Sequence, residues 1–219
     1  MKYLEIFISI IAILAFSTSC KKESESCPIE FVVFGEVLPY AETYKVGDTL
    51  TLKTNYNYMI YEKNTKQYFD MKGLNIEAIL YIIRTDTIFD SISGKVTEYV
   101  EVLDNNNYNY SIQNFSDGSS ELFSDILFDG KTFKHELKII LKKKGIFMLT
   151  YGPSTIENNF NFEGKCDKYS FFLYTRLNEN SNNNIELLSL SPDEHFNTWI
   201  LQMPNERFYR GRFAYRVIE

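Results

Sequence analysis

The stretch FKHELKIIL, residues 133–141, alternates apolar and polar side chains along the chain. A period of two places alternate side chains on opposite faces of a β-strand, so one face of this strand is buried and the other mostly meets water. The buried face holds Phe133, His135, Leu137, Ile139 and Leu141. Such alternation is typical of an antiparallel sheet that packs on a core with one face only.

The sequence on either side of this strand predicts its neighbours. Asp129-Gly130 separates it from the apolar run 122–128, and Asp-Gly between two such runs is a strong β-hairpin signal. The segment 142–145 (KKKG) ends the strand, and the apolar run 146–151 begins the next. We therefore expect consecutive strands between residues 122 and 151.

Six further segments show strand patterning, with Gly-, Asn- and Asp-rich turns between them: 29–37, 49–58, 74–84, 96–103, 169–177 and 213–218. Residues 78–83 (AILYII) are apolar on both faces, which indicates a central strand covered on both sides. Many short strands with this punctuation predict a mainly β fold, an antiparallel β-sandwich of the Ig-like or a related type.

One segment near the C-terminus predicts a short helix. Ser191-Pro192 offers an N-cap followed by proline at the first helical position, and Glu194 lies where a capping box places its acid. Pro204 would end the helix, so we expect it over about 192–202. Its apolar face then holds Phe196, Trp199, Ile200 and Met203.

Composition limits the classes of function. With 219 residues, 44% of them hydrophobic and 24% charged, the chain is long enough for one medium or two small globular domains. A formal net charge of −6 gives no long-range attraction for a phosphate backbone, so we expect no nucleic-acid partner. Two histidines and three cysteines argue against a soft-metal site with several ligands, and we expect neither a metal nor another cofactor.

The N-terminus predicts an export signal. Residues 6–16 (IFISIIAILAF) suit the apolar core of a signal peptide and are shorter than the about 20 residues that a membrane-spanning helix needs. Small residues at 17–19 then lead to Cys20 and the polar stretch 21–25. A lipoprotein signal peptidase needs small side chains before a cysteine whose thiol takes a diacylglycerol. We predict a signal peptide over 1–19 and lipidation of Cys20; an ordinary secretory signal with a chance cysteine is the alternative.

These residues resemble the start of bacterial lipoproteins, particularly those of Bacteroidota, in which a Ser-rich lipobox precedes Cys-Lys-Lys-Glu. Ser17 departs from the common lipobox, which has Leu at that place. The segments 44–49 (YKVGDT), 144–147 (KGIF) and 211–217 (GRFAYRV) are similar in style to Bacteroidota lipoproteins with Ig-like or related sandwiches. The resemblance implies Sec export and a lipid anchor in the outer membrane, on its periplasmic or cell-surface face. No activity and no catalytic residue transfers with it.

Residues 20–27 then form the lipidated cysteine and a polar tether, and 28–219 form the sandwich domain. A division into two small domains near the Asn-rich stretch 104–109 is the alternative. Cys27 and Cys166 remain after lipidation and would pair in an oxidising periplasm, tying the N-terminal segment to the core. Two unpaired, buried thiols are the other interpretation.

No catalytic motif stands out. Neither His135, on an apolar strand face, nor His195, in the predicted helix, has a Cys or Ser at motif spacing. We expect a core histidine and a surface histidine, and no catalytic residue is assigned. The 29 acidic residues allow paired carboxylates for sugar hydrolysis, but nothing in the sequence selects a pair.

Aromatic residues reach 16% of the chain, and several cluster along it. Rings with nearby Asn side chains suit a carbohydrate, because a flat apolar face takes the sugar ring and amides take its hydroxyls. Tyr56, Tyr58, Tyr61 and Tyr68 fall in or beside one strand, and the candidate ligand-binding aromatics are Tyr108, Tyr110, Trp199 and Tyr209. The plainer interpretation is that Tyr is a common strand residue.

Three short segments, Asp48-Thr49-Leu50, Asp86-Thr87-Ile88 and Asp90-Ser91-Ile92, resemble the Asp-Thr/Ser-apolar signal for O-glycosylation in Bacteroidota. This resemblance implies modification at Thr49, Thr87 or Ser91.

The first functional hypothesis is a non-catalytic binding or assembly module, held at the membrane by its lipid, with a glycan or an envelope or host protein as its ligand. It rests on a sandwich without a nucleophile, metal cluster or cofactor loop. A carboxylate-dependent hydrolase and a structural envelope lipoprotein are the alternatives.

Overall fold

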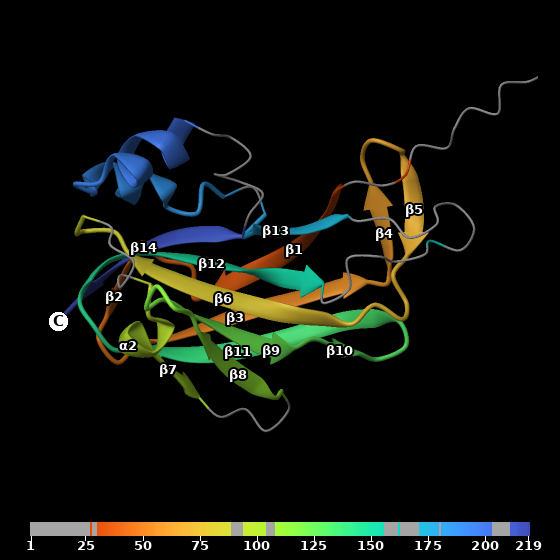
Figure 1. Ribbon diagram of the computed structural model, residues 1–219, viewed down its shortest axis with the longest axis horizontal. Coiled ribbons are helices and arrows are strands. Elements are labelled where there is room, and N and C mark those ends of the chain that lie inside the picture. The colour runs from red at the N-terminus through yellow and green to blue at the C-terminus, as the bar shows by residue number, and fades with distance from the viewer. Residues whose placement is uncertain are drawn as a thin grey trace, which may run out of the picture.

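The computed structural model describes residues 27, 30–88, 94–103, 108–155, 162, 171–179, 181–202 and 211–219. The strands among these residues form two sheets packed face to face, which confirms the predicted β-sandwich (Figure 1). Sheet A contains β1 (Glu30–Leu38), β3 (Thr49–Asn57), β4 (Met59–Glu62), β5 (Gln67–Asp70), β7 (Val100–Leu103), β10 (Leu127–Phe128), β11 (Thr132–Leu141) and β13 (Phe172–Leu177). Sheet B contains β2 (Thr43–Lys45), β6 (Ile76–Arg84), β8 (Tyr110–Asn114), β9 (Ser120–Asp125), β12 (Gly145–Thr155) and β14 (Arg212–Ile218).

Strand β11 behaves as its sequence pattern predicts. Its alternate residues from Phe133 to Leu141 are buried, and the residues between them are exposed or half-buried. The predicted hairpin at Asp129-Gly130 joins β10 to β11, with Phe128 opposite Phe133. The inner faces of both sheets contribute to one apolar core, because the longer strands such as β1, β3 and β11 bury alternate side chains.

Connections among the described residues link the two sheets along the sides of the sandwich. On one side the chain passes from sheet B to sheet A through Ile126, between β9 and β10. On the other side Gly211 links the sheets: its N–H donates to the Thr175 carbonyl on β13 (2.7 Å), and its carbonyl accepts from the Tyr151 N–H on β12 (2.8 Å). This link fixes the position of β13 against sheet B.

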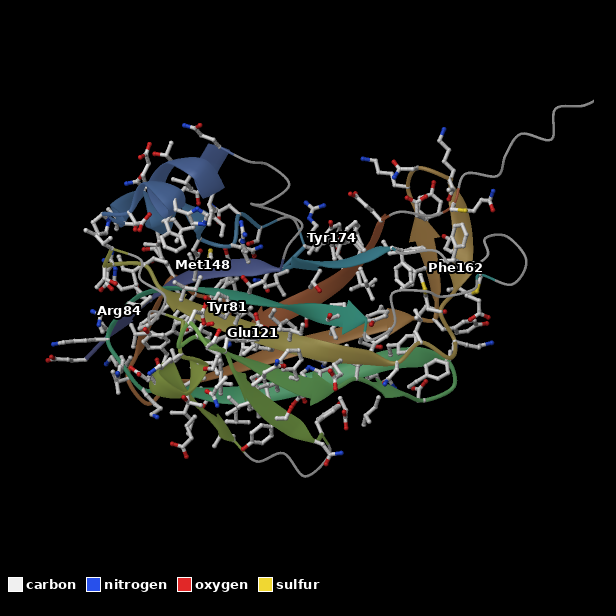
Figure 2. All side chains as sticks on the ribbon, in the orientation of Figure 1. Tyr81, Arg84, Glu121, Met148, Phe162 and Tyr174 are labelled. Atoms are coloured by element: carbon white, nitrogen blue, oxygen red, sulfur yellow. The ribbon has the colours of Figure 1, made fainter. Side chains whose placement is uncertain are left out.

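A helical segment covers part of the outer face of sheet B. It contains the 3₁₀-helix η1 (Ile185–Leu190) and the π-helix η2 (His195–Ile200), which lie over β14 in Figure 1. Leu188, Phe196 and Ile200 are fully buried there against Met148 of β12, which Figure 2 labels beneath this segment. The outer face of sheet B is thus partly buried, as the two-faced apolar pattern of β6 predicts. Among the described residues, no helix has the length and apolar character needed to cross a bilayer.

The predicted helix begins later than expected. Ser191 Oγ accepts from the Asp193 N–H (3.1 Å), and Asp193 Oδ1 in turn accepts from the His195 N–H (2.8 Å). Asp193 therefore satisfies a donor of the first turn, so the capping-box assignment to Ser191 and Glu194 is wrong. The burial of Phe196 and Ile200 is confirmed, whereas η1 was not predicted.

Two features of the strand assignments also differ from expectation. Residues 96–103 do not form one strand: Val96–Tyr99 is a single helical turn, α2, and only Val100–Leu103 pairs with β11. Two pairings are parallel, β1 with β13 and β2 with β14, in a sandwich that was predicted to be antiparallel. An alternation of apolar and polar residues shows which side chains are buried, and it is the same in parallel and antiparallel strands. The sequence pattern therefore does not reveal the direction in which two strands pair.

Candidate functional site

Five aromatic side chains from four strands share the outer surface of sheet A. We call this surface the aromatic face: Phe34 of β1, Tyr61 of β4, Tyr68 of β5, and Phe172 and Tyr174 of β13. Four of them are well exposed, with exposed fractions of 45% for Phe34, 46% for Tyr61, 59% for Tyr68 and 57% for Phe172. Tyr174 is half-buried, and Figure 2 labels it on β13. Exposed rings gathered on one sheet face mark an interaction surface.

Strand register brings these rings to the same face. On β1, Phe31 and Val33 are buried, so Val32 and Phe34 point outward. Val32 lies opposite Tyr174 of β13. On the other side of β1, Phe31 lies opposite Glu62, so the next pair in that antiparallel register places Val32 beside Tyr61.

Tyr174, Val32 and Tyr61 thus form a row across β13, β1 and β4, and this row continues onto β5, the last strand of the sheet. Tyr61 lies opposite Tyr68, with ring centroids 5.3 Å apart. Three strand spacings separate β13 from β5, so the row that runs from Tyr174 past Val32 and Tyr61 to Tyr68 extends about 14 Å. Phe172 and Tyr174 are two residues apart on β13, and their rings are parallel at a centroid distance of 5.8 Å.

Charged side chains lie between the rings. Arg176 of β13 lies opposite Phe34, and Glu30 of β1 lies opposite Phe172. Glu36 and Lys63 are exposed on the same strands and their turn. The centre of a protein–protein interface is normally depleted of charge, whereas hydrogen-bonding groups beside aromatic rings suit hydroxylated ligands. The aromatic face therefore combines flat apolar surfaces with hydrogen-bonding groups.

A second layer of rings supports the aromatic face from inside. Phe31, Phe69, Phe162 and Phe171 form a cluster in the core beneath β1, β4 and β5, with centroid distances of 5.2 to 5.8 Å. Figure 2 labels Phe162 at this end of the molecule. Four of these five contacts are edge-to-face, an arrangement that aromatic pairs prefer. Strand β13 is further held to β1 by the Asn178 side chain, which accepts from the Val37 N–H (2.8 Å).

The four candidate aromatics of the sequence do not form one cluster among the described residues. Tyr108 packs on His135 with a centroid distance of 5.1 Å, and Tyr110 is exposed on the edge strand β8. Trp199 lies in η2, over β14 and three or more strands away from β8, and its side chain lies outside the described residues, as does Tyr209. Their role in ligand binding stays a prediction.

The tyrosine group of β3 to β5 divides between the two sides of sheet A. Tyr56 faces the core and stacks on Phe133, while Tyr61 and Tyr68 point outward. Tyr58 holds the Lys72 ammonium over its ring at 3.8 Å. Sequence clustering therefore identified two members of the aromatic face. It missed Phe34, Phe172 and Tyr174, although the spacing Phe172-Leu173-Tyr174 places two rings on one face of any strand.

His135 is a buried structural residue. Its side chain is 1% exposed, and its Nδ1 shares a hydrogen bond of 2.6 Å with Tyr151 Oη, which connects β11 of sheet A to β12 of sheet B. Burial lowers the pKa of His135 to about 4, against a smaller opposing effect of the Asp125 carboxylate. Burial also raises the pKa of Tyr151 well above its usual value. Both groups are therefore neutral near pH 7, and His195 is exposed on η2.

Of the remaining predicted positions, some are among the described residues and others are not. Cys27 is disulfide-bonded, while its predicted partner Cys166 and the lipidation site Cys20 lie outside the described residues. Thr49 and Thr87 are exposed, as O-glycosylation requires, and Ser91 is not described. The modifications themselves stay predictions.

A concave region lies at the end of β14. It is an open pocket of about 480 Å³, lined by Arg84, Asp86, Lys144 and Arg216 among others. Its two carboxylates are held in ion pairs, Asp86 with Arg84 at 2.5 Å and Glu219 with Lys144 at 2.5 Å.

Comparisons with known proteins identify no family. No protein-family model and no curated protein matches the chain. Among solved structures, a non-cellulosomal cohesin from the archaeon Archaeoglobus fulgidus matches with 8% identity and a TM-score of 0.33, over 88% of this chain and 93% of that one. A human F-spondin reeler domain matches with 10% identity and a TM-score of 0.33, over 71% and 91%.

A type II cohesin dyad from the ScaA scaffoldin of Acetivibrio cellulolyticus matches with 9% identity and a TM-score of 0.32, over 66% of this chain. The chain spans 46% of that dyad. Similarity at this level transfers neither a ligand nor a partner.

Proposed function

We propose that this chain is an exported lipoprotein of the outer membrane whose sandwich binds a glycan without transforming it, through the aromatic face. The observation that carries the proposal is the group of five rings on the outer surface of β13, β1, β4 and β5, four of them well exposed, with charged side chains beside them. Each ring offers a flat apolar surface to one face of a sugar, and Arg176, Glu30 and Lys63 offer hydrogen bonds to its hydroxyls.

The ligand that fits this surface is an extended oligosaccharide. The aromatic row runs across the strands on an open sheet face, so a chain of sugars would lie along the row and perpendicular to the strands. Binding on an open face leaves most of each sugar in water, so we expect modest affinity for a single chain. A lipid anchor at Cys20 would compensate for it, because many tethered copies engage one polymer together.

Glycan-array screening of the mature chain, followed by calorimetry on the best oligosaccharide, tests the proposal. We expect Tyr61→Ala and Phe172→Ala each to weaken binding by about tenfold, since stacking contacts of one ring contribute on the order of 1–1.5 kcal/mol. Ile88→Ala is the matched control, because Ile88 is a large exposed apolar residue away from the aromatic face. It should bind like the wild type.

Two results would contradict the proposal. One is a silent array combined with capture of a protein by the same face, which would make the ligand a protein. The other is unchanged glycan affinity in both ring variants together with a loss in Tyr110→Ala, which would move the site to β8. Circular dichroism and thermal melting of each variant separate lost binding from lost folding.

A further inference from the structure

Arg176 is a half-buried cation on the aromatic face that has no acidic partner. Thr175 and Leu177, its neighbours on β13, are buried, so the Arg176 side chain points outward from sheet A. Among the described residues, no carboxylate forms an ion pair with its guanidinium and no group accepts a hydrogen bond from it. Arg84, by contrast, binds Asp86 through two nitrogens, at 2.5 and 3.2 Å. A guanidinium that has lost part of its water shell without gaining a partner is available to an anion from outside the chain.

Two aromatic rings flank Arg176. Phe34 of β1 lies opposite it in the parallel register, where adjacent strands are about 4.8 Å apart, and Tyr174 precedes it by two residues on β13. Phe34 is well exposed, and Figure 2 labels Tyr174 on the strand that carries Arg176. A sugar that stacks on Phe34 or Tyr174 therefore lies next to the guanidinium, which can bind a charged substituent of that sugar.

The acidic side chains of the aromatic face leave the charge of Arg176 unpaired. Glu30 lies four residues from Arg176 in the register of β1 with β13, about 13 Å away. Glu36 is nearer, but its direct cross-strand neighbour is Lys53 of β3, which offsets its charge. Arg176 thus presents a positive charge beside the rings, although the chain as a whole carries a formal net charge of −6.

We propose that the aromatic face selects acidic glycans and that Arg176 determines this selectivity, by binding a carboxylate or sulfate group of a sugar stacked on Phe34 or Tyr174. The inference rests on the proposed glycan-binding function and names the class of glycan. The planar guanidinium offers two parallel N–H donors, and two oxygens of one anionic group accept them together. A hydroxyl group of a neutral glycan carries no charge and accepts one such bond, so it gains less from the same contact.

A glycan array of acidic and neutral polysaccharides tests the class of ligand. Oligomers of galacturonan, alginate and hyaluronan supply carboxylates, dextran sulfate supplies sulfate groups, and galactan and dextran are the neutral members. Calorimetry then compares the tightest acidic glycan with its own neutral derivative, which is the methyl ester of a uronate or the desulfated form of a sulfated glycan. We expect the mature chain to bind the acidic form at least about tenfold more tightly, and the difference to shrink as salt is added. The derivative that loses affinity identifies the charged group as carboxylate or sulfate.

Three variants test whether Arg176 provides this preference. Arg176→Gln should bind the acidic and the neutral form equally. Arg176→Lys should keep part of the preference, because an ammonium group retains the charge without the bidentate geometry. Lys45→Gln is the matched control, since it removes the same charge from an exposed lysine on β2 of sheet B and should keep the wild-type preference. Melting temperatures confirm that each variant is folded.

Two results would overturn this inference and leave glycan binding by the rings in place. One is a wild-type chain that binds the neutral derivative as tightly as the acidic glycan. The other is full retention of the acidic preference in Arg176→Gln, which would assign the selectivity to another residue. A chain that binds no glycan on the array removes the proposed function together with this inference.

Discussion

His135 makes the stability of the sandwich depend on pH. Its pKa is lowered from 6.5 to about 4 in the folded chain, because burial disfavours the charged ring. The unfolded chain therefore binds a proton between these values and the folded chain does not. The resulting stability is fully present above pH 6.5 and is lost as the pH falls from 6.5 towards 4, by up to about 3 kcal/mol.

Urea unfolding at pH 7.5, 6.0 and 5.0 measures this loss. The window lies above the ordinary pKa of the carboxylates, so their protonation contributes little to it. We expect His135→Phe to be about 1–3 kcal/mol less stable at pH 7.5, because Tyr151 Oη loses its partner, and to depend less on pH. His195→Gln should keep the wild-type profile, and an equally steep profile in His135→Phe would contradict the assignment.

Gly211 is one of the residues at which the two sheets meet. Its φ of +62° is in the left-handed region, and an added Cβ would lie 1.9 Å from the Tyr151 carbonyl oxygen. The backbone at Gly211 and at Tyr151 cannot move apart without cost, because the Tyr151 N–H donates to the Gly211 carbonyl in the link between β12 and β13. We expect Gly211→Ala to cost more than about 2 kcal/mol, as strained and overpacked positions do.

Gly47→Ala is the matched control for this prediction. Gly47 has a φ of +92°, but nothing lies within 4 Å of an added Cβ. The free energy of unfolding of Gly47→Ala should fall by only about 1–2 kcal/mol, the cost of a left-handed conformation for a residue with a Cβ. Thermal melting of both variants measures the difference, and equal losses would mean that the contact at Gly211 relaxes.

Among the elements, the segment η1–η2 is held to sheet B by few side chains. Phe196 is 1% exposed and packs in the small apolar cluster with Met148 and Ala214. We expect Phe196→Ala to destabilise this cluster by about 3–5 kcal/mol, the usual cost of such a cavity. Because the cluster is separate from the main core, the loss should appear first as local opening.

Hydrogen exchange resolves that opening. Amides of 185–200 should exchange faster in Phe196→Ala while those of β11 keep their protection. Leu190→Ala is the control, because Leu190 is exposed and its loss leaves no cavity. Uniform loss of protection in both regions would show that the segment and the sandwich unfold together.

The strands show which parts of the fold sequence patterns can predict. Residues 133–141 and the Asp129-Gly130 hairpin were predicted because burial alternates with period two and the turn has its own signal. The parallel partners of β1 and β2 were not, since direction leaves no trace in that alternation. Val96–Tyr99 reads as strand by its residue types, but it packs as a helical turn against β6 and β9.

Only part of the aromatic face could be predicted from the sequence, because local patterns do not show which distant strands pair. Tyr61 and Tyr68 are close in the chain, and their strands form a hairpin. Phe34 and Phe172 are far apart in the chain and share a surface only because β13 returns parallel to β1. Clustering along the sequence instead selected Tyr108 and Tyr110, of which one packs on the core histidine and the other lies on a free edge.

On the scale of the whole molecule, the remaining prediction concerns Cys20 and the membrane. A lipidated N-terminal cysteine carries two or three acyl chains, and each buried methylene contributes about 0.8 kcal/mol, so the mature chain should stay in the membrane fraction after a high-salt wash. Intact mass should show acyl groups and a chain that begins at Cys20.

In Cys20→Ser we expect no acyl mass and retention of Met1, because the signal peptidase for lipoproteins needs the modified thiol. Cys27→Ser serves as the control and should keep the acyl mass, since Cys27 is disulfide-bonded. A native chain that keeps Met1, or that carries no acyl mass, would remove the anchor from the proposed function and leave the aromatic face to act in solution.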